Sequence, residues 1–382
     1  MDNDETLPIT ENGVIKAIKR MKNGKAFGHD SITAEHMKYG GASVSKYLCR
    51  IYNGIVQLEE YPHAFKRLTV VPLFKGGKRD KMDENNYRDI SIASQLQKVF
   101  EKILFDRLYP IFKQNKFSHE LQQGFRPKCS SLTAAFTMKE TISYYIEYNS
   151  CIYAAYLDNE KDFNGVWITG LLYKLFNIGV RGRYWRIIKS SYQDIVSSVF
   201  FNGVYSESYQ IKQGVGQGRT LSSWMFLAMI NDLIPELISL GKGSVINDSH
   251  ILIADDTSLI SPTLSGLRAM LDTVSEYASK WRLKYNASKS CFMIFGGKKH
   301  RYGNKNFNIS LNGTALERVF NVKYAGIDID CNLRIRNAVS RCKKSLTVVN
   351  SLAPVGFTSS GMSPSHAIKI WEKVVIPMEK SF

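Results

Sequence analysis

Apolar positions along the chain follow two spacings. Four segments place an apolar residue every three or four positions, the period of an amphipathic helix; they are residues 14–21, 96–108, 221–237 and 264–281. Short apolar runs of strand character occupy residues 151–159, 198–211 and 290–297. The second run contains Asn202-Gly203, a strong hairpin turn signal. Because helices and strands mix without strict strand–helix–strand alternation, we predict an α+β fold with an antiparallel sheet.

Residues 249–261, SHILIADDTSLIS, place two adjacent carboxylates, Asp255 and Asp256, inside a segment with strand spacing. A third carboxylate, Asp158, follows the apolar run that begins at residue 151. If these strands pair in one sheet, we expect the three carboxylates to lie close together. Clustered like charges raise the pKa of one member, and a divalent cation such as Mg²⁺ removes that cost because it prefers oxygen ligands. A surface turn also suits aspartate, so the ADD triplet alone leaves both readings open.

The chain is strongly basic, with 51 Lys and Arg against 34 Asp and Glu and a net charge of +17 over 382 residues. This excess favours a polyanionic partner, most simply nucleic acid, although a generic basic protein has the same balance. The six cysteines form no C-x-x-C pair, which argues for free thiols and against a zinc module. Without a signal peptide or a membrane-length apolar run, we expect an intracellular protein of the nucleus, the cytoplasm or both, with no membrane partner.

Nine sequence motifs follow one another along most of the chain. They are NGKAFGHDSI (23–32), VVPLFKGGKRD (70–80), NYRDISIASQLQKVFEKILFDRL (86–108), QQGFRPKCSSLTA (122–134), YLDNEKDFNGV (156–166), GVGQGRTLSSWMF (214–226), IADD (253–256), WRLKYNASKSCFMIF (281–295) and VKYAGIDID (322–330). In this order they resemble the motifs of the reverse transcriptase domain of non-LTR (LINE-like) retrotransposons. One such motif is a weak signal, but nine in collinear order make chance implausible.

The resemblance implies a right-hand polymerase fold with fingers, a palm and the start of a thumb. By it, residues 1–150 are fingers with an N-terminal extension, discontinuous with the palm; residues 151–297 are the palm; and residues 298–382 are the palm end and a partial thumb. It also implies an RNA-directed DNA polymerase that adds dNTPs to the 3′-hydroxyl of a DNA primer on an RNA template. The cofactors would be two Mg²⁺ ions, with Mn²⁺ as a substitute. The oligomeric state stays open.

The resemblance also assigns roles to single residues. Asp158, Asp255 and Asp256 would be the catalytic carboxylates and metal ligands, with the backbone carbonyl of Asn159, and Lys289 would protonate the leaving pyrophosphate. The residues that would bind the nucleotide are Lys75, Arg88, Phe163, Gln217 and Gly218. Those that would bind template and primer are Lys25, Asn86, Gly124 and Arg126.

Two of these roles have an alternative. The ring of Phe163 stands at the family's bulky position against the sugar 2′-position, but a lone Phe is also commonly a packing residue. Lys289 follows a predicted helix, so it is nearly as well explained as a surface lysine.

Several positions beside the expected metal site depart from the family pattern. Asp162 replaces a small alanine, Ile253 replaces an aromatic residue, Gly216 replaces a basic residue, and Arg219 stands where a small residue is usual. All three carboxylates are retained. An active polymerase is therefore the leading hypothesis, and a degenerate or host-retained copy that binds nucleic acid without efficient polymerisation is the alternative. A different two-metal palm enzyme, such as a cyclase, leaves the finger motifs unexplained.

Overall fold

The chain divides into two compact units, which are described one at a time. Unit 1 comprises Met1–His119, Glu160–Asp232 and Tyr277–Lys284, and unit 2 comprises Glu120–Asn159, Leu233–Glu276 and Tyr285–Phe382. The computed structural model describes residues 7–77, 79–115, 117, 119–126, 129–160, 162–244, 250–253, 256–296, 307–324, 327–333 and some positions within 347–370.

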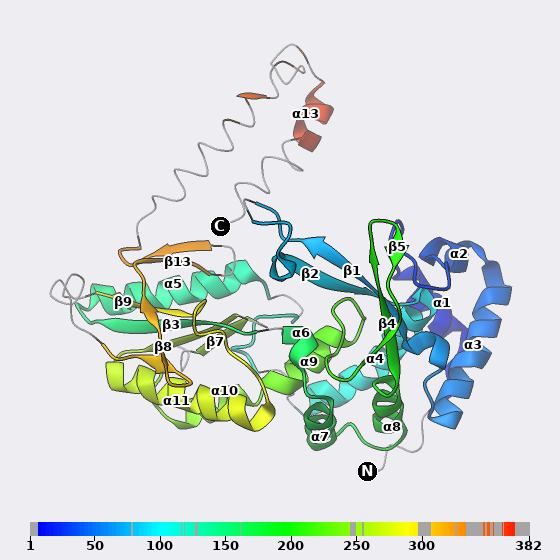
Figure 1. Ribbon diagram of the computed structural model, residues 1–382, viewed down its shortest axis with the longest axis horizontal. Helices are drawn as coiled ribbons and strands as arrows, with labels where there is room; N and C mark the ends of the chain where they lie inside the picture. The colour runs from blue at the N-terminus through cyan, green and yellow to red at the C-terminus, as the bar shows by residue number, and fades with distance from the viewer. Residues whose placement is uncertain are drawn as a thin grey trace. The chain divides into compact units, whose positions relative to one another are not determined.

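Unit 1 contains a five-stranded mixed sheet (Figure 1). Its strands are β1 (Arg67–Phe74), β2 (Tyr87–Ile92), β4 (Ile195–Phe201), β5 (Val204–Tyr205) and β6 (Tyr209–Ile211). The order is β2-β1-β4-β5, with β6 also on β4; β1 runs antiparallel to β2 and parallel to β4. The predicted hairpin is confirmed: Asn202 and Gly203 join β4 to β5 with φ angles of 50° and 84°, and a type I′ turn requires both to be positive.

The helices of unit 1 include two that the apolar spacing predicted. They are α1 (Glu11–Lys19), α2 (Ala34–Tyr39), α3 (Gly41–Leu58), α4 (Gln95–Gln114), α6 (Asp162–Gly165), α7 (Ile168–Ile178), α8 (Gly182–Ser191) and α9 (Ser222–Ile230), with 3₁₀ turns η1 (His63–Lys66) and η2 (Glu84–Asn86). Helix α1 begins where the Thr10 side chain accepts the N–H of Gly13, and it buries Val14, Ala17 and Ile18. The predicted helix at 96–108 is the middle of α4.

The predicted continuous helix over 221–237 is wrong. The segment forms α9, which ends at Ile230, and α10 (Leu233–Ser239), so the break falls at the boundary between the two units. Pro235 has no N–H, and its ring would clash with the carbonyl of Asn231 in a continuous helix. The Asn231 side chain instead donates a hydrogen bond to the carbonyl of Phe117.

A buried lysine fixes the end of α9. Lys174 of α7 is 4% exposed, and its Nζ donates to the carbonyl of Met229 at 2.5 Å and to Asp232 at 2.6 Å. The same ammonium group lies 3.8 Å from the ring centroid of Trp281. A buried ammonium group needs such partners, so the chain turns at Asp232 rather than continuing as a helix.

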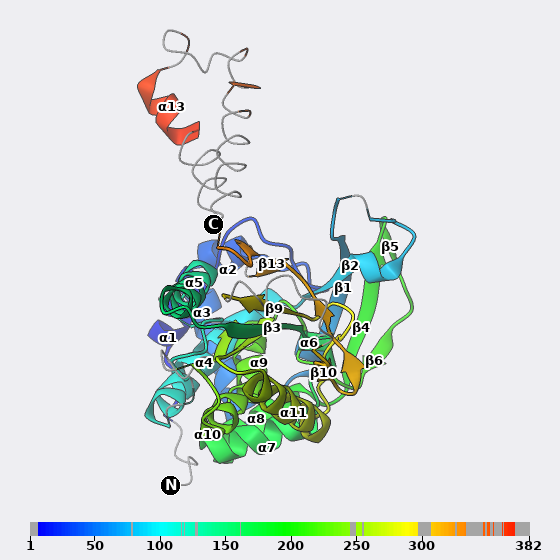
Figure 2. The same cartoon turned by 90° about the vertical axis from the view of Figure 1, so that its left-hand side faces the viewer.

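Unit 2 is built on the sheet β12-β9-β3-β8-β7. Its strands are β3 (Ile152–Asp158), β7 (His250–Ile253), β8 (Asp256–Ser261), β9 (Cys291–Phe295) and β12 (Glu317–Arg318). All neighbours are antiparallel except β12 and β9. Helix α5 (Ser131–Glu147) covers one face and α11 (Leu264–Trp281) the other (Figures 1 and 2). On the α5 face, Ala154 and Tyr156 pack with Met138 and Ile142.

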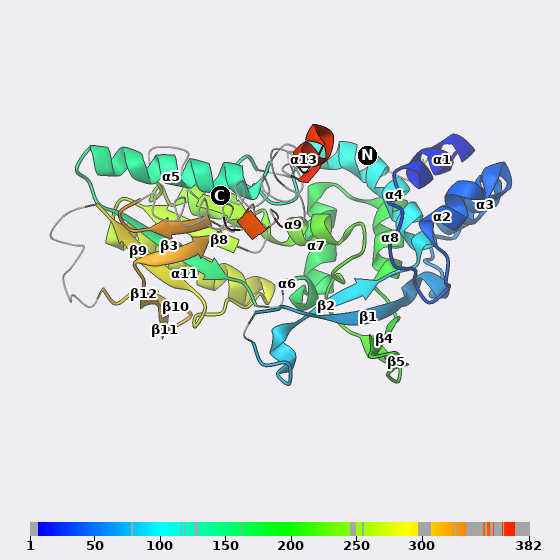
Figure 3. The ribbon, with the colours of Figure 1, turned by 90° about the horizontal axis from the view of Figure 1, so that it is seen from above.

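Two small hairpins complete unit 2, β10 (Ser310–Leu311) with β11 (Thr314–Ala315) and β13 (Asn321–Tyr324) with β14 (Ile327–Asp330). The β10–β11 hairpin lies near β12 (Figure 3). Helix α13 (Pro364–Ile370) is the last described element. None of the helices described here is long and apolar enough to cross a membrane.

The predicted α+β class with an antiparallel sheet is confirmed. The boundaries drawn for fingers, palm and thumb stay predictions, and much of the predicted thumb segment lies outside the described residues.

Candidate active site

The sheet of unit 2 brings two of the predicted carboxylate positions to neighbouring strands. Strands β3 and β8 pair with Asp158 directly opposite Asp256. Asp158 closes a strand whose preceding residues are mostly buried, and its own side chain is 41% exposed. Asp255 lies in the connection between β7 and β8, outside the described residues, so its position stays a prediction.

A turn at residues 286–290 holds the backbone of Asp158 on both sides. The N–H of Asn286 donates to the carbonyl of Asp158 at 2.8 Å, and the N–H of Asp158 donates to Ser290 Oγ at 3.1 Å. The hydroxyl of Ser290, which is 2% exposed, donates in turn to the carbonyl of Asn286 at 2.7 Å. Because both polar backbone groups of Asp158 are engaged, the end of β3 is fixed where its carboxylate emerges.

The same turn places Lys289 beside Asp158. The side-chain oxygen of Asn286 accepts the N–H of Lys289 at 3.2 Å and the hydroxyl of Ser288 at 2.7 Å. Lys289 Nζ lies 3.9 Å from Asp158 Oδ2, with side-chain exposures of 65% and 41%. Exposed ion pairs of this kind contribute little to stability, so the ammonium group is close to the carboxylate without being locked to it.

Sequence reasoning missed Asn286 and Ser290 as supports of this site. Both belong to the motif that contains Lys289, in which only the lysine was given a role. The sequence signal for both was their place in that motif, with Asn286 three positions before Lys289 and Ser290 directly after it.

The carbonyl of Asn159 was predicted as an additional metal ligand. Asn159 forms an isolated antiparallel bridge with Tyr285, made by the N–H groups of Glu160 and Asn286. Neither hydrogen bond uses the Asn159 carbonyl. Among the described side chains, no group of three or more His, Cys, Asp or Glu is arranged to hold a metal. Asp255 and the side chain of Asp256 lie outside the described part of the chain. The oxygen donors present, carboxylate and carbonyl, are of the type that hard divalent cations prefer.

In unit 1, the loop with Gln217 and Gly218 packs closely against β2. The N–H of Ser91 donates to the Gln217 carbonyl at 2.7 Å. Gly218 has a φ of 118°, and a Cβ there would lie 2.4 Å from the Ser91 carbonyl oxygen, so only glycine fits. The N–H of Val215 donates to the carbonyl of Phe163 at 2.8 Å, which ties the predicted gate residue to the same loop.

The ring of Phe163 stacks against Phe226, with centroids 5.2 Å apart and planes at 27°. The side chain is half-buried. Packing against Phe226 therefore accounts for the buried part of the Phe163 side chain. The role of Phe163 as a gate stays a prediction.

The other predicted nucleotide-binding side chains lie on β1 and β2 or just beyond them. Lys75 follows β1, and its Nζ donates to the carbonyl of Asn85 at 2.7 Å. The Asn86 side chain donates to the carbonyl of Asp80 at 2.9 Å, so it stabilises this turn. Arg88 lies on β2 and is exposed.

The remaining template and primer candidates belong to loops of both units. Lys25 is exposed in unit 1. In unit 2, the N–H of Gly124 donates to the side chain of Gln122 at 2.8 Å. Arg126 donates to the carbonyls of Glu120 and Gln122 at 2.9 and 3.1 Å. Arg126 thus stabilises the conformation of its own loop. Its contact with nucleic acid stays a prediction.

A buried ion pair anchors the Gln217–Gly218 loop to α4. Arg219 Nη2 lies 2.8 Å from Glu101 Oε1, with side-chain exposures of 4% and 0%. The other carboxylate oxygen of Glu101 accepts the N–H of Thr220 at 2.8 Å. Burial alone would raise the pKa of Glu101, but the Arg219 charge and the hydrogen bonds outweigh it, so this pKa lies below its ordinary value.

The departures at positions 216 and 219 are coupled. Gly216 has a φ of +72°, and a Cβ there would lie 3.3 Å from Cδ of Arg219. A larger residue at 216 would be strained and would crowd the inward-turned arginine. The inward conformation of Arg219 is therefore compatible with glycine at position 216.

Comparison with known proteins identifies the family. Residues 77–329 match the family model of reverse transcriptase (RNA-dependent DNA polymerase). The chain belongs to this family, and the resemblance to non-LTR retrotransposon reverse transcriptases is confirmed.

Two of the curated relatives are named as RNA-directed DNA polymerases of mobile elements in Drosophila. The RNA-directed DNA polymerase from mobile element jockey of Drosophila funebris is 23% identical over 377 residues, which cover 97% of this chain and 40% of the relative. The probable RNA-directed DNA polymerase from transposon BS of Drosophila melanogaster is 26% identical over 333 residues, which cover 85% and 36%. The chain thus spans about 40% or less of the length of these two relatives. A solved structure of apo telomerase from Candida tropicalis is 14% identical over 76% of this chain and 52% of that one, with a TM-score of 0.47.

The Glu101–Arg219 pair generates a stability prediction. Arg219→Ala leaves a buried carboxylate without its counter-charge, so we expect the free energy of unfolding at neutral pH to fall by about 3–5 kcal/mol. The measurement is urea denaturation followed by circular dichroism. Arg20→Ala is the control, because the Arg20–Asp106 pair is 47% and 50% exposed and should contribute less than about 1 kcal/mol.

The same prediction has a pH dependence. The folded-state pKa of Glu101 is depressed. Its contribution to the free energy of unfolding is therefore complete above the unfolded-state pKa of about 4.3, and it is lost as the pH falls through the folded-state pKa. The difference between wild type and Arg219→Ala should therefore shrink on acidification. Equal effects of Arg219→Ala and Arg20→Ala at neutral pH would contradict the assignment.

Proposed function

We propose that this chain acts as the RNA-directed DNA polymerase domain of a non-LTR retrotransposon. It adds dNTPs to the 3′-hydroxyl of a DNA primer, directed by an RNA template. The observation that supports this most is the register of β3 and β8, with Asp158 opposite Asp256, in a chain of the reverse transcriptase family. The relatives from jockey and transposon BS are named as RNA-directed DNA polymerases, which supports the same activity here.

Reverse transcriptases generally use divalent metal ions. We propose two Mg²⁺ ions, with Mn²⁺ as a substitute, held by Asp158, Asp255, Asp256 and the carbonyl of Asn159. Directly opposed positions of an antiparallel pair share one face of the sheet, which supports joint binding by Asp158 and Asp256. Such ions, when bound, activate the primer hydroxyl and neutralise the charge of the triphosphate.

The protein's own contribution is positioning and proton transfer. The turn at 286–290 fixes the backbone of Asp158, which keeps its carboxylate at the end of β3. Lys289 is held near that carboxylate without being locked to it. We propose that its Nζ donates a proton to the leaving pyrophosphate, which is general acid catalysis.

The proposed roles in unit 1 concern the incoming nucleotide. Exposed Arg88 suits a phosphate clamp, because its guanidinium can bind two oxygens at once, and Lys75 adds a point charge. Gly218 offers bare backbone, and Gln217 lies beside it. Phe163, tied to the same loop, would exclude a ribose 2′-hydroxyl.

The proposed contacts with template and primer come from Lys25, Asn86, Gly124 and Arg126. Such contacts follow the phosphate backbone, so they tolerate sequence and weaken with salt.

The alternative is a copy that binds nucleic acid without efficient polymerisation. It rests on four residues that depart from the family pattern: Asp162, Ile253, Gly216 and Arg219. The buried pair of Arg219 with Glu101 favours the active enzyme, because it anchors the loop in which two of these departures lie.

Primer extension tests the proposal directly. We expect the natural chain to extend a DNA primer on an RNA template with Mg²⁺ and dNTPs, and Asp255→Asn to abolish extension with template affinity unchanged or slightly higher. Asp272→Asn is the matched control, since Asp272 is an exposed carboxylate on α11. Extension by Asp255→Asn would refute the metal assignment. No extension by a folded natural chain that still binds template–primer would support the binding-only alternative.

The role of Lys289 gives a second kinetic prediction. Lys289→Gln should lower kcat about 100-fold, within the range for loss of a general acid. Lys284→Gln, a change at an exposed lysine five positions earlier in the sequence, should leave kcat unchanged. Single-turnover nucleotide addition is the measurement, and similar rates for the two variants would make Lys289 a surface residue only.

A further inference from the structure

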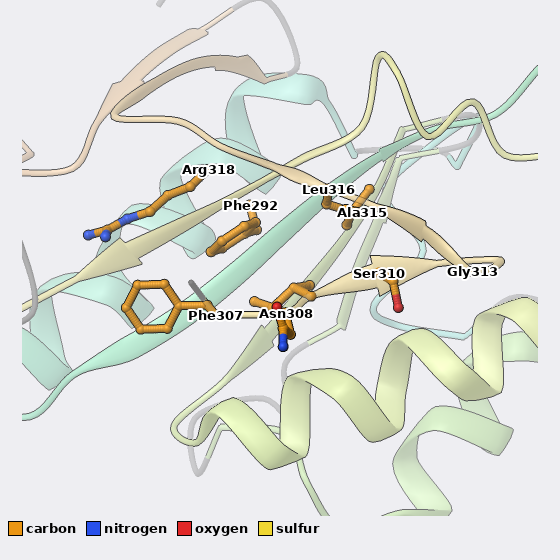
Figure 4. Close-up of a pocket in the computed structure, with 9 residues that line it drawn as sticks. Phe292, Phe307, Asn308, Ser310, Gly313, Ala315, Leu316 and Arg318 are labelled. Carbon is orange, nitrogen blue, oxygen red and sulfur yellow. The ribbon is translucent and has the colours of Figure 1, made fainter. Parts of the chain in front are cut away.

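Unit 2 contains a cavity of about 420 Å³ beside the β10–β11 hairpin (Figure 4). Phe292 of β9 and Phe307 line one part of it, and Ser310, Ala315 and Arg318 contribute from the neighbouring strands. The volume falls in the range of about 300–1,000 Å³ that is typical of small-molecule sites. A group the size of a nucleotide fits a cavity of this volume.

The cavity lies on the sheet face opposite to that of Asp158. Phe292 pairs with Ala155, and Ala155 alternates with Tyr156 along β3. Asp158 is two positions beyond Tyr156 and so shares its face, because alternate strand residues point to the same side. The cavity is therefore separate from the candidate active site.

The walls combine aromatic rings with a guanidinium group. The rings of Phe292 and Phe307 meet edge to face, with centroids 6.3 Å apart and planes at 72°. Cζ of Arg318 lies 5.0 Å from the ring centroid of Phe307 and 5.2 Å from that of Phe320. A guanidinium that stacks on rings directs its N–H groups within its own plane, where phosphate oxygens are bound.

The position of Phe307 is fixed by α11. Arg268 donates a hydrogen bond to the backbone carbonyl of Phe307. The backbone at Phe307 is thus held at the edge of the cavity before any ligand arrives, which lowers the entropic cost of binding.

The charge of the neighbouring sequence favours a polyanion. The eight residues KKHRYGNK at 298–305, just before Phe307, contain four Lys and Arg and no Asp or Glu. Glu317 precedes Arg318 on β12 and therefore lies on the other face of that strand. An anionic ligand with a planar ring fits the combination of Arg318 and the aromatic walls.

We propose that this cavity binds one unpaired nucleotide of a single-stranded RNA, with its base on Phe307 and Phe292 and its phosphate on Arg318. Base–aromatic stacking tolerates any base, so the site would hold RNA without sequence preference. The choice of RNA rests on the proposed function. The site gives the chain a contact with RNA that is independent of the catalytic carboxylates.

Fluorescence anisotropy tests the site with a labelled single-stranded RNA oligonucleotide, without primer or dNTPs. We expect Phe307→Leu and the cavity-filling change Ala315→Leu to weaken binding about 10-fold. An abasic oligonucleotide of equal length should bind Phe307→Leu and wild type equally. Arg318→Gln should weaken binding of both oligonucleotides, because it acts on the phosphate. Phe136→Leu, at a phenylalanine 59% exposed on α5, is the matched control.

The outcomes separate this inference from the proposed function. Unchanged RNA affinity in both Phe307→Leu and Ala315→Leu would overturn the inference even if the natural chain extends primers. Weakened binding with no primer extension by the natural chain would support the cavity and refute polymerisation. The same measurement is made with a DNA oligonucleotide of the same sequence. If Phe307→Leu and Ala315→Leu weaken binding of DNA more strongly than binding of RNA, the assignment to RNA is wrong.

Discussion

The antiparallel pairing of β3 with β8 is the constraint on which the candidate site depends. It brings Asp158 opposite Asp256, which lies 98 positions later in the chain. Both carboxylates stand at the ends of strands that are otherwise mostly uncharged. Two neighbouring carboxylates repel each other, so the arrangement needs nearby positive charges or hydrogen-bond donors. In the structure, the backbone of Asp158 is held by Asn286 and Ser290, and Lys289 supplies a nearby positive charge.

The two units solve the problem of charge in different ways. In unit 1, Glu101 and Arg219 are both buried, so each depends on the other, and Glu101 also accepts a hydrogen bond from the N–H of Thr220. That arrangement suits a loop that must keep one conformation. In unit 2, Asp158 and Lys289 are both partly exposed, and water weakens their attraction. Such a pair can exchange partners, as a site for charged ligands requires.

The sequence predicted elements whose signals are local. The spacing of apolar residues located α1, α4 and α11, and Asn202-Gly203 located the β4–β5 hairpin. It failed at 221–237, where the apolar spacing outweighed the local signal of Pro235. The turn there also depends on Lys174, which binds the end of α9 from a distant helix. The sequence also could not pair Arg219 with Glu101, 118 positions away. The assigned roles of the site residues came from motif order and stay predictions, since Asp255 lies outside the described residues.

Departures from a family pattern are informative only when their contacts are known. Arginine at 219 stands where a small residue is usual, yet its side chain turns inward to a buried carboxylate. Glycine at 216 suggested a lost charge, yet its positive φ and the nearby Cδ of Arg219 leave little room for a larger residue. The two changes fit each other, as expected when one substitution makes the next tolerable. Random decay has no reason to produce a buried ion pair with all its hydrogen bonds, because an unmatched buried charge destabilises the fold. The loop therefore retains a defined conformation by different means from the family pattern.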